Sequence, residues 1–319
     1  MLPILPTALL GLLLATPAGA TTKAQWISFN RAGAPSSNLQ CFTPNNVTVA
    51  GGNLVITTKV ETATCSSFDL RPATYNYTSG FVAMRSFSFL YGTLKVRAKL
   101  GGGIATGAWP VIWMADVSCQ PSDPSGTDND CNEQEIDVAE ILGSDFRHVN
   151  QQIHVDRFKH NDGCGATTSD TSQNFHVYEL DWAPGSLVYK VDGTATCTIK
   201  QPYVPDSPMY LKINTFVGTY GGPMKKGSLP WETKVDYVSV GQGSKEIFRD
   251  DFNDSSTIEP AEFVVANPPT ARNSSVTFIE GSFLNPPRWF VFSSLGVVTI
   301  AICTALYRLK ARREGTSSR

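Results

Sequence analysis

Alternating apolar and polar residues predict β-strands over most of the chain between residues 24 and 252. The stretch "NVTVAGGNLVITTKV" (46–60) alternates on both sides of a Gly-Gly pair, which indicates a hairpin. Further strands are predicted in "SFSFLYGTLKVRAKL" (86–100), "HVYELDWAPGSLVYKVDGTATCTI" (176–199), "MYLKINTFV" (209–217) and "WETKVDYVSV" (231–240). No segment between them has the spacing of a long amphipathic helix, so the pattern favours a sandwich of two antiparallel sheets.

The two ends of the chain differ from this pattern. Residues 1–20 form an apolar run that closes on Ala-Gly-Ala, which is typical of a signal peptide cleaved before the domain at 21–252. Residues 289–307 hold no charge and are long enough to span a bilayer, and the basic tail at 308–319 would stay in the cytoplasm. Residues 253–288 read as a stalk. We therefore expect a single-pass type I protein of the plasma membrane, with its domain outside the cell.

Cysteines and glycosylation triplets agree with an extracellular domain. Six cysteines precede the predicted span, which favours three disulfides, and pairing of sequential neighbours is the simplest arrangement: Cys41, Cys65, Cys119, Cys131, Cys164 and Cys197. Four Asn-x-Ser/Thr triplets are predicted to carry N-glycans, at Asn46, Asn76, Asn253 and Asn273. The net charge of −2 gives no support to nucleic-acid binding.

Within the stretch "NEQEIDVAEIL" (132–142), the segment "EIDVAEIL" (135–142) places three acids among apolar residues and otherwise reads as a strand. Side chains alternate along a strand, so Glu135 and Asp137 share one face and Glu140 is out of phase. A β-bulge near residues 138–139 would return Glu140 to the face of the other two. A solvated polar face is the alternative, but the remaining residues of the segment are apolar and suit a core. Two carboxyl groups on one face are what a retaining glycosidase requires.

These residues resemble a known family. "EIDVAE" is similar to the E-[aliphatic]-D-x-x-E signature of family 16 glycoside hydrolases, in the bulged form of laminarinase-like members. "YGTLKVRAKL", "GAWPVIWMA", "FHVYELDWAPGSLVYKVDG" and "KVDYVSV" resemble four further segments of that family, in the same order. Thr93 departs from the arginine that the family often carries, which we expect to change a subsite and not the chemistry.

The resemblance implies an all-β, concanavalin A-like jelly roll with a concave substrate cleft. It implies Glu135 as nucleophile, Asp137 as its electrostatic helper and Glu140 as acid/base. Five further residues are predicted to bind substrate: Trp109, Trp113, His154, Asn214 and Arg97. The alternatives are core packing for the two tryptophans, a structural role for His154 and a solvent-facing position at a sheet edge for Arg97.

The resulting functional prediction is an endo-acting hydrolase of β-glucan, in particular of glucan that contains β-1,3 linkages. A cell-wall transglycosylase that uses the same residues and a non-catalytic β-glucan-binding protein are the alternatives. The sequence holds no phosphate loop, nucleophile elbow or zinc motif, so we expect no cofactor and no catalytic metal. Many proteins of this fold carry a structural Ca²⁺, but no diagnostic loop is present. We expect a monomer from a wall-bearing eukaryote such as a fungus.

Overall fold

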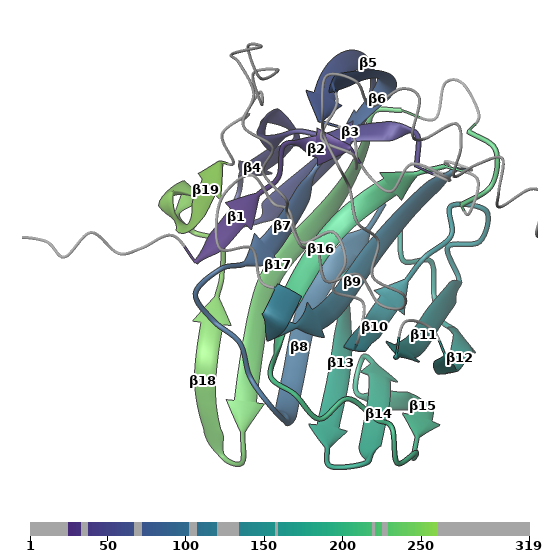
Figure 1. Ribbon diagram of the computed structural model, residues 1–319, viewed down its shortest axis with the longest axis vertical. Helices are drawn as coiled ribbons and strands as arrows, with labels where there is room; N and C mark the ends of the chain where they lie inside the picture. Colours follow the sequence, from purple (N-terminus) through teal and green to yellow (C-terminus); the bar gives the residue numbers. More distant parts are fainter. Residues whose placement is uncertain are drawn as a thin grey trace, which may run out of the picture. The chain divides into compact units, whose positions relative to one another are not determined.

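The computed structural model describes residues 25–32, 38–66, 72–101, 107–119, 134–156, 159–218, 221–224 and 229–260. These residues form two β-sheets and three short 3₁₀ turns, η1 (Pro44–Asn46), η2 (Val117–Cys119) and η4 (Ser255–Thr257), and they contain no α-helix. The all-β sandwich predicted from the sequence is confirmed (Figure 1).

The first sheet has eight strands, and neighbouring strands in Figure 1 follow its hydrogen-bonded order. That order is β12 (His160–Thr167), β11 (His148–Val155), β10 (Gln134–Glu140), β9 (Ala108–Asp116), β16 (Met209–Val217), β7 (Phe81–Met84), β1 (Trp26–Ser28) and β19 (Ile258–Pro260).

The second sheet has eleven strands. Its main path is β15 (Thr194–Ile199), β14 (Ser186–Val191), β13 (His176–Ala183), β8 (Gly92–Leu100), β17 (Trp231–Gln242), β5 (Leu54–Ser66), β6 (Pro72–Ser79), β3 (Gln40–Phe42) and β2 (Arg31–Ala32). Two strands lie off this path, β4 (Val47–Val49) beside β5 and β18 (Lys245–Asp250) beside β17.

The core lies between the two sheets. Alternate residues of β8, such as Leu94 and Val96, are fully buried and belong to the same hydrophobic cluster as Ile112 and Met114 of β9. Burial of one such side chain contributes about 1.5–3 kcal/mol relative to leaving it exposed. Because only one face of each sheet is committed to this core, the opposite faces are available for polar side chains.

Two details of the predicted fold are corrected. The sheets are not wholly antiparallel, because β1 pairs with β19 and β3 pairs with β6 in parallel. The folded domain also does not end at residue 252, because β19 at 258–260 pairs with β1 and therefore belongs to the first sheet. The sequence signal for β19 is only three residues long, and its partner lies at the other end of the domain.

Two of the three sequential disulfides are present. Cys41 is bonded to Cys65, and Cys164 is bonded to Cys197. The second bond joins β12 to β15, which are edge strands of different sheets, so it ties the sandwich together at one side. Because Cys131 lies outside the described residues, the remaining pair stays a prediction.

One predicted glycosylation site is corrected. Asn46 is 1% exposed, and its side-chain nitrogen donates hydrogen bonds to the Thr57 carbonyl (2.6 Å) and the Thr78 hydroxyl (3.0 Å). The folded protein therefore does not present this nitrogen to solvent. Asn76 and Asn253 are exposed, and Asn273 lies outside the described residues.

The predicted signal peptide (1–20), span (289–307) and basic tail (308–319) also lie outside the described residues. Within the described part of the chain, no helix is long and apolar enough to cross a membrane.

Candidate active site

Strand β10 contains the predicted β-bulge. Asp137 pairs with Trp113 of β9, whereas Glu140 pairs with Val111, so three steps along β10 match two steps along β9. The register with β11 shifts between the same two residues of β10. Val138 and Ala139, which occupy the bulge, are both fully buried, so local packing against the core accompanies the irregularity.

The bulge brings the three acids to one face of the first sheet. Asp137 Oδ2 lies 3.3 Å from His154 Nε2, and Glu140 Oε2 accepts a 2.6 Å hydrogen bond from Gln152 Nε2. Gln152 and His154 are two residues apart on β11 and therefore share a face, and His154 pairs with Glu135 across the strands. We call the face that carries Glu135, Asp137 and Glu140 the acidic face.

Glu140 is held in its protonated form. Its side chain is buried, and burial raises the pKa of the carboxyl to about 8, with the negative charge of Asp137 adding to the rise. The hydrogen bond from Gln152 favours the carboxylate and opposes the rise in pKa. Glu140 Oε1 also accepts a hydrogen bond from Trp109 Nε1 at 3.1 Å. A carboxylic acid in this state can donate a proton near neutral pH.

Glu135 and Asp137 form a coupled pair with unequal proton affinities. Burial raises the pKa of Glu135, but the positive charges of His154 and Lys212 oppose the rise. Burial also raises the pKa of Asp137, well above its usual range, and the charge of Glu135 raises it further. The pKa of Asp137 is therefore raised further than that of Glu135, so Glu135 is the acid of the pair that ionises first as the pH rises.

Aromatic side chains flank the acids. Trp113 lies directly across from Asp137, and its Nε1 donates a 2.7 Å hydrogen bond to Asn214 Oδ1. Trp109 packs against Phe216, with 4.7 Å between ring centroids. Both tryptophans are partly exposed, so their rings are accessible for stacking on sugar. The structure thus brings together Trp109, Trp113, His154 and Asn214 of the predicted substrate-binding set.

Two residues of the acidic face were not identified from the sequence. Gln152 holds Glu140, and it precedes His154 by two positions, so strand alternation gave a usable signal. Lys212 lies on β16 beside Trp113, with its side chain 3% exposed. A single charged residue in the apolar segment "MYLKINTFV" is itself an anomaly that could have marked it.

One atom of each of Glu135, Asp137 and His154 lies within 4.8 Å of the others. Two carboxylates and an imidazole at this spacing resemble a partial metal-ligand set, but they also suit groups that share protons. His154 Nδ1 is 2.7 Å from Asn161 Oδ1, which fixes the ring with Nε2 towards Asp137. We interpret the group as a proton-sharing cluster.

Arg97 and Thr93 are corrected. Both lie on β8, whose alternate residues form the core, so they project from the opposite face of the second sheet. Arg97 pairs with Asp236 at 2.5 Å and packs over the Phe175 ring, and Thr93 donates a 2.7 Å hydrogen bond to Asp181. Neither side chain belongs to the acidic face. The solvent-facing alternative for Arg97 holds, although β8 lies inside the sheet and not at its edge.

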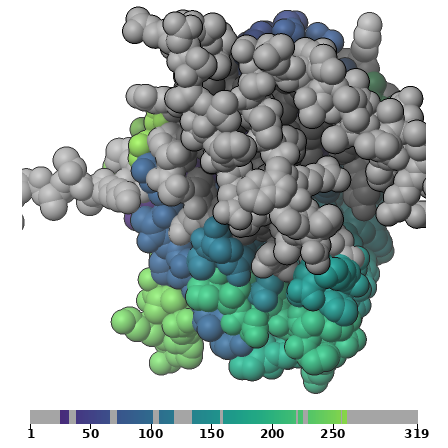
Figure 2. Space-filling model, viewed as in Figure 1, coloured from purple at the N-terminus to yellow at the C-terminus, as the bar shows by residue number. Residues whose placement is uncertain are grey.

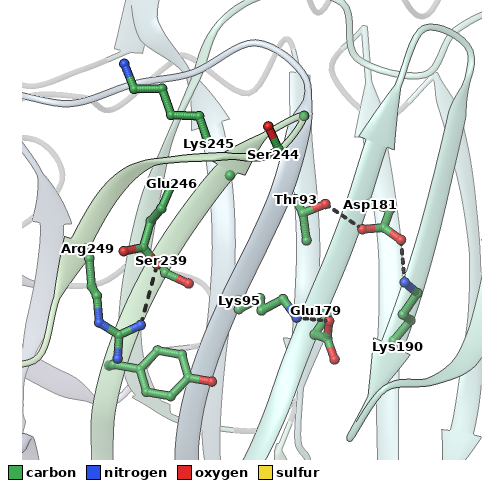
Figure 3. A pocket seen from close by; sticks show the side chains of 13 residues that line it. Thr93, Lys95, Glu179, Asp181, Lys190, Ser239, Ser244, Lys245, Glu246 and Arg249 are labelled. Carbon is green, nitrogen blue, oxygen red and sulfur yellow. Dashed lines mark hydrogen bonds and ion pairs between the residues drawn. The ribbon is translucent and has the colours of Figure 1, made fainter.

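That outer face of the second sheet holds a polar depression of about 480 Å³ (Figure 3). Its carboxylates are paired with cations: Glu179 with Lys95 at 2.9 Å and Asp181 with Lys190 at 2.5 Å. Residues of β18 and of the β13–β14 hairpin line this depression, and these two segments lie on opposite sides of the lower part of the molecule in Figure 2. A third acid, Glu246, pairs with Arg249 at 3.5 Å, so the acids of this depression differ from those of the acidic face in that each has its own lysine or arginine partner.

The two-sheet fold and the bulged acidic strand define a β-sandwich with carboxyl chemistry of the glycosidase type. The family model for glycosyl hydrolases family 16 matches residues 39–239, and the chain belongs to this family.

Individual relatives agree with this assignment. The chain is 30% identical over 200 residues to the endo-1,3-1,4-beta-glycanase EglC of Rhizobium meliloti, covering 61% of this chain and 39% of that protein. It is 31% identical over 186 residues to a beta-1,3-glucan-binding protein of Penaeus monodon, covering 46% and 49%. The chain therefore spans between two fifths and one half of these curated relatives.

A solved structure shares the fold. The model superimposes with a TM-score of 0.58 on a LamA variant from Z. galactanivorans in complex with laminaritriose and laminaritetraose. The two chains are 27% identical, and the match covers 68% of this chain and 92% of the other.

Proposed function

We propose that this chain is a retaining, endo-acting hydrolase of β-glucan that contains β-1,3 linkages. The observation that carries the proposal is the β-bulge of β10, which places Glu135 and Glu140 on one face of the first sheet, where burial raises the pKa of Glu140 to about 8. The relatives named above, an endo-glycanase and a laminarin-oligosaccharide complex, support the substrate class.

The proposed reaction is a double displacement. Glu135 attacks the anomeric carbon while Glu140 protonates the departing glycosidic oxygen, which gives a covalent glycosyl-enzyme. Glu140, now a carboxylate, then removes a proton from water as the water displaces Glu135. Asp137 holds a proton next to Glu135, and Trp109, Trp113 and His154 contact the sugar. Asn214 is fully buried and supports Trp113 by accepting the hydrogen bond from its Nε1. These steps need no cofactor, and a structural Ca²⁺ stays an untested prediction.

The test is product analysis with the full-length chain on laminarin, mixed-linkage β-1,3/1,4-glucan and β-1,6-branched glucan. New reducing ends and shorter oligosaccharides from laminarin are expected. Products longer than the substrate would instead favour the transglycosylase alternative, because a sugar hydroxyl would then replace water in the second step. Binding to laminarin without any new product would favour the glucan-binding alternative, which the Penaeus monodon relative exemplifies.

We also propose that the chain is a monomer anchored at the cell surface by residues 289–307, with Asn76, Asn253 and Asn273 as glycan acceptors. The support is the sequence pattern alone. The full-length chain should remain in the membrane pellet after alkaline carbonate extraction and should lose mass on treatment with peptide N-glycosidase. Release by carbonate would contradict the anchor, and an unchanged mass would contradict the glycans.

A further inference from the structure

Lys212 is a buried cation on the acidic face that the proposed reaction leaves without a role. Its Nζ lies 4.3 Å from the centroid of the Trp113 ring and 5.1 Å from the centroid of the Tyr210 ring. A buried ammonium is costly unless aromatic faces or opposite charges compensate for lost hydration. The two rings provide the first kind of compensation, and the acids of β10 are placed to provide the second.

The strand register places Lys212 on the acidic face, one row away from Glu135. Across β16, β9 and β10, Tyr210, Ala115 and Glu135 form one row, and Lys212, Trp113 and Asp137 form the next. Ala115 has only a methyl side chain, so no long side chain of β9 stands between β16 and Glu135 in that row. The ammonium of Lys212 lies against the Tyr210 ring of that row, and its positive charge opposes the rise in the pKa of Glu135.

The other groups that act on Glu135 among the described residues lie on two strands. Asp137 and Glu140 are acids on its own strand, and His154 pairs with it from β11. Asp137 and Glu140 have raised pKa values, which limits their negative charge. His154 already contacts Asp137 through Nε2 and Asn161 through Nδ1. Lys212 is thus the cation that reaches Glu135 from the opposite side of the acidic face to His154.

We propose that Lys212 is a positioning residue for the nucleophile: held between Trp113 and Tyr210, its ammonium keeps Glu135 ionised and directed into the substrate site. This inference rests on the proposed function, because that proposal assigns Glu135 as the nucleophile. The order of ionisation that it requires is a property of the protein without substrate, so it can be tested separately.

The direct test is a ¹³C-carboxyl NMR titration of the full-length chain labelled at glutamate and aspartate, with the Glu135 signal assigned from Glu135→Gln. In the wild type, Glu135 is expected to ionise at lower pH than both Asp137 and Glu140. Ionisation of Glu135 after Glu140 would overturn the proposal whether or not any Lys212 variant folds.

Variants then isolate the charge. Lys212→Met keeps the aliphatic stem against Trp113 and is expected to raise the pKa of Glu135 by about one pH unit. Lys212→Arg keeps the charge and should restore the wild-type titration to within a few tenths of a pH unit. An unchanged Glu135 titration in Lys212→Met, with native near-UV circular dichroism, would overturn the proposal.

Kinetics on laminarin provide the second readout. Lys212→Met should move the acid limb of the kcat/KM profile to higher pH. For each pH unit by which that limb moves, kcat/KM at the acid end should fall about tenfold, with little change at the alkaline end. A residue that only packs would lower activity equally at every pH. If the wild type does not act on laminarin, the proposed function fails, while the NMR titration still decides the role of Lys212.

Discussion

Acidic side chains lie on the outer faces of both sheets, and the pKa values of Glu140 and Asp181 are shifted in opposite directions. On the acidic face, burial and neighbouring acids raise the pKa of Glu140 to about 8. In the depression on the outer face of the second sheet, burial alone would raise the pKa of Asp181, but hydrogen bonds from Lys190 and Thr93 outweigh it, so the pKa is lowered (Figure 3).

The two regions differ in the partners given to each acid. Glu179 and Asp181 each form an ion pair with a lysine of a neighbouring strand, Lys95 and Lys190 respectively. Among the described residues, the three acids of β10 instead share one face with one another and with Gln152, His154 and Lys212. Acids that lack individual cations hold protons at neutral pH, and a held proton is what acid catalysis needs.

The largest expected effect comes from substituting matched glutamates in the two regions. Glu135→Gln should lower turnover of laminarin by at least about 10⁴-fold with binding largely intact, because it removes the attacking atom. Glu179→Gln, the same substitution in the outer depression, should leave turnover within about twofold. Comparable losses in both variants, measured as reducing ends per minute, would show that the two regions do not differ in function.

The next effect concerns the acid. Wild-type activity should fall as the pH rises through about 8, because Glu140 must be protonated to act. Glu140→Gln should lower kcat by about 10²–10⁴-fold and remove that alkaline limb. Substrates with a good aryl leaving group should lose less, since they need less protonation. A wild-type profile that stays flat past pH 9 would contradict the assigned role.

Stability should respond to the same proton. Because the folded pKa of Glu140 lies above its unfolded value, the folded state binds more protons, and stability declines as pH rises from about 4.5 to about 8. Glu140→Gln removes this penalty and should stabilise the protein by about 2–4 kcal/mol at pH 8.5 and little at pH 4. Urea unfolding at the two pH values measures the difference. A gain that does not depend on pH would point to packing instead.

Asp181 provides the smallest effect, with the reverse sign. The pKa of Asp181 is lower in the folded state than in the unfolded state, so its charge stabilises the folded protein at pH values above the unfolded-state pKa. This contribution is lost as the pH falls through the folded-state pKa. Asp181→Asn should therefore destabilise the protein at pH 7 by less than about 1 kcal/mol, since the pair with Lys190 is partly exposed. In urea unfolding the effect should diminish as the pH falls into the acid range where Asp181 becomes protonated, and a larger loss at low pH than at pH 7 would contradict the assignment.

Much of the site could be predicted because strand alternation is a local property. The out-of-phase Glu140 required a bulge, and the bulge lies where the sequence indicated. Alternation also groups residues by face within one strand, but it does not say which sheet the strand joins. For this reason the sequence leaves open whether Arg97 binds substrate or faces solvent, and the structure places its strand in the other sheet.

Other features depend on contacts between distant segments. Lys212 shares a face with Glu135 because β9 lies between β16 and β10 and pairs with both strands. The parallel pair of β1 and β19 joins residues 26–28 to 258–260, and neither short strand carries a strong pattern of its own. Asn46 matched a glycosylation triplet, yet its burial follows from hydrogen bonds to β5 and β6.

Covalent trapping tests the central claim most directly. A 2-deoxy-2-fluoro laminari-oligosaccharyl fluoride should react with the wild-type chain and accumulate as a glycosyl-enzyme, because the fluorine slows the second displacement more than the first. Peptide mass spectrometry should locate the sugar on Glu135, and Glu140→Gln should still be labelled because fluoride needs little protonation to depart. A label on Asp137 or Glu140, or no label on an enzyme that hydrolyses laminarin, would contradict the assignment of Glu135 as nucleophile.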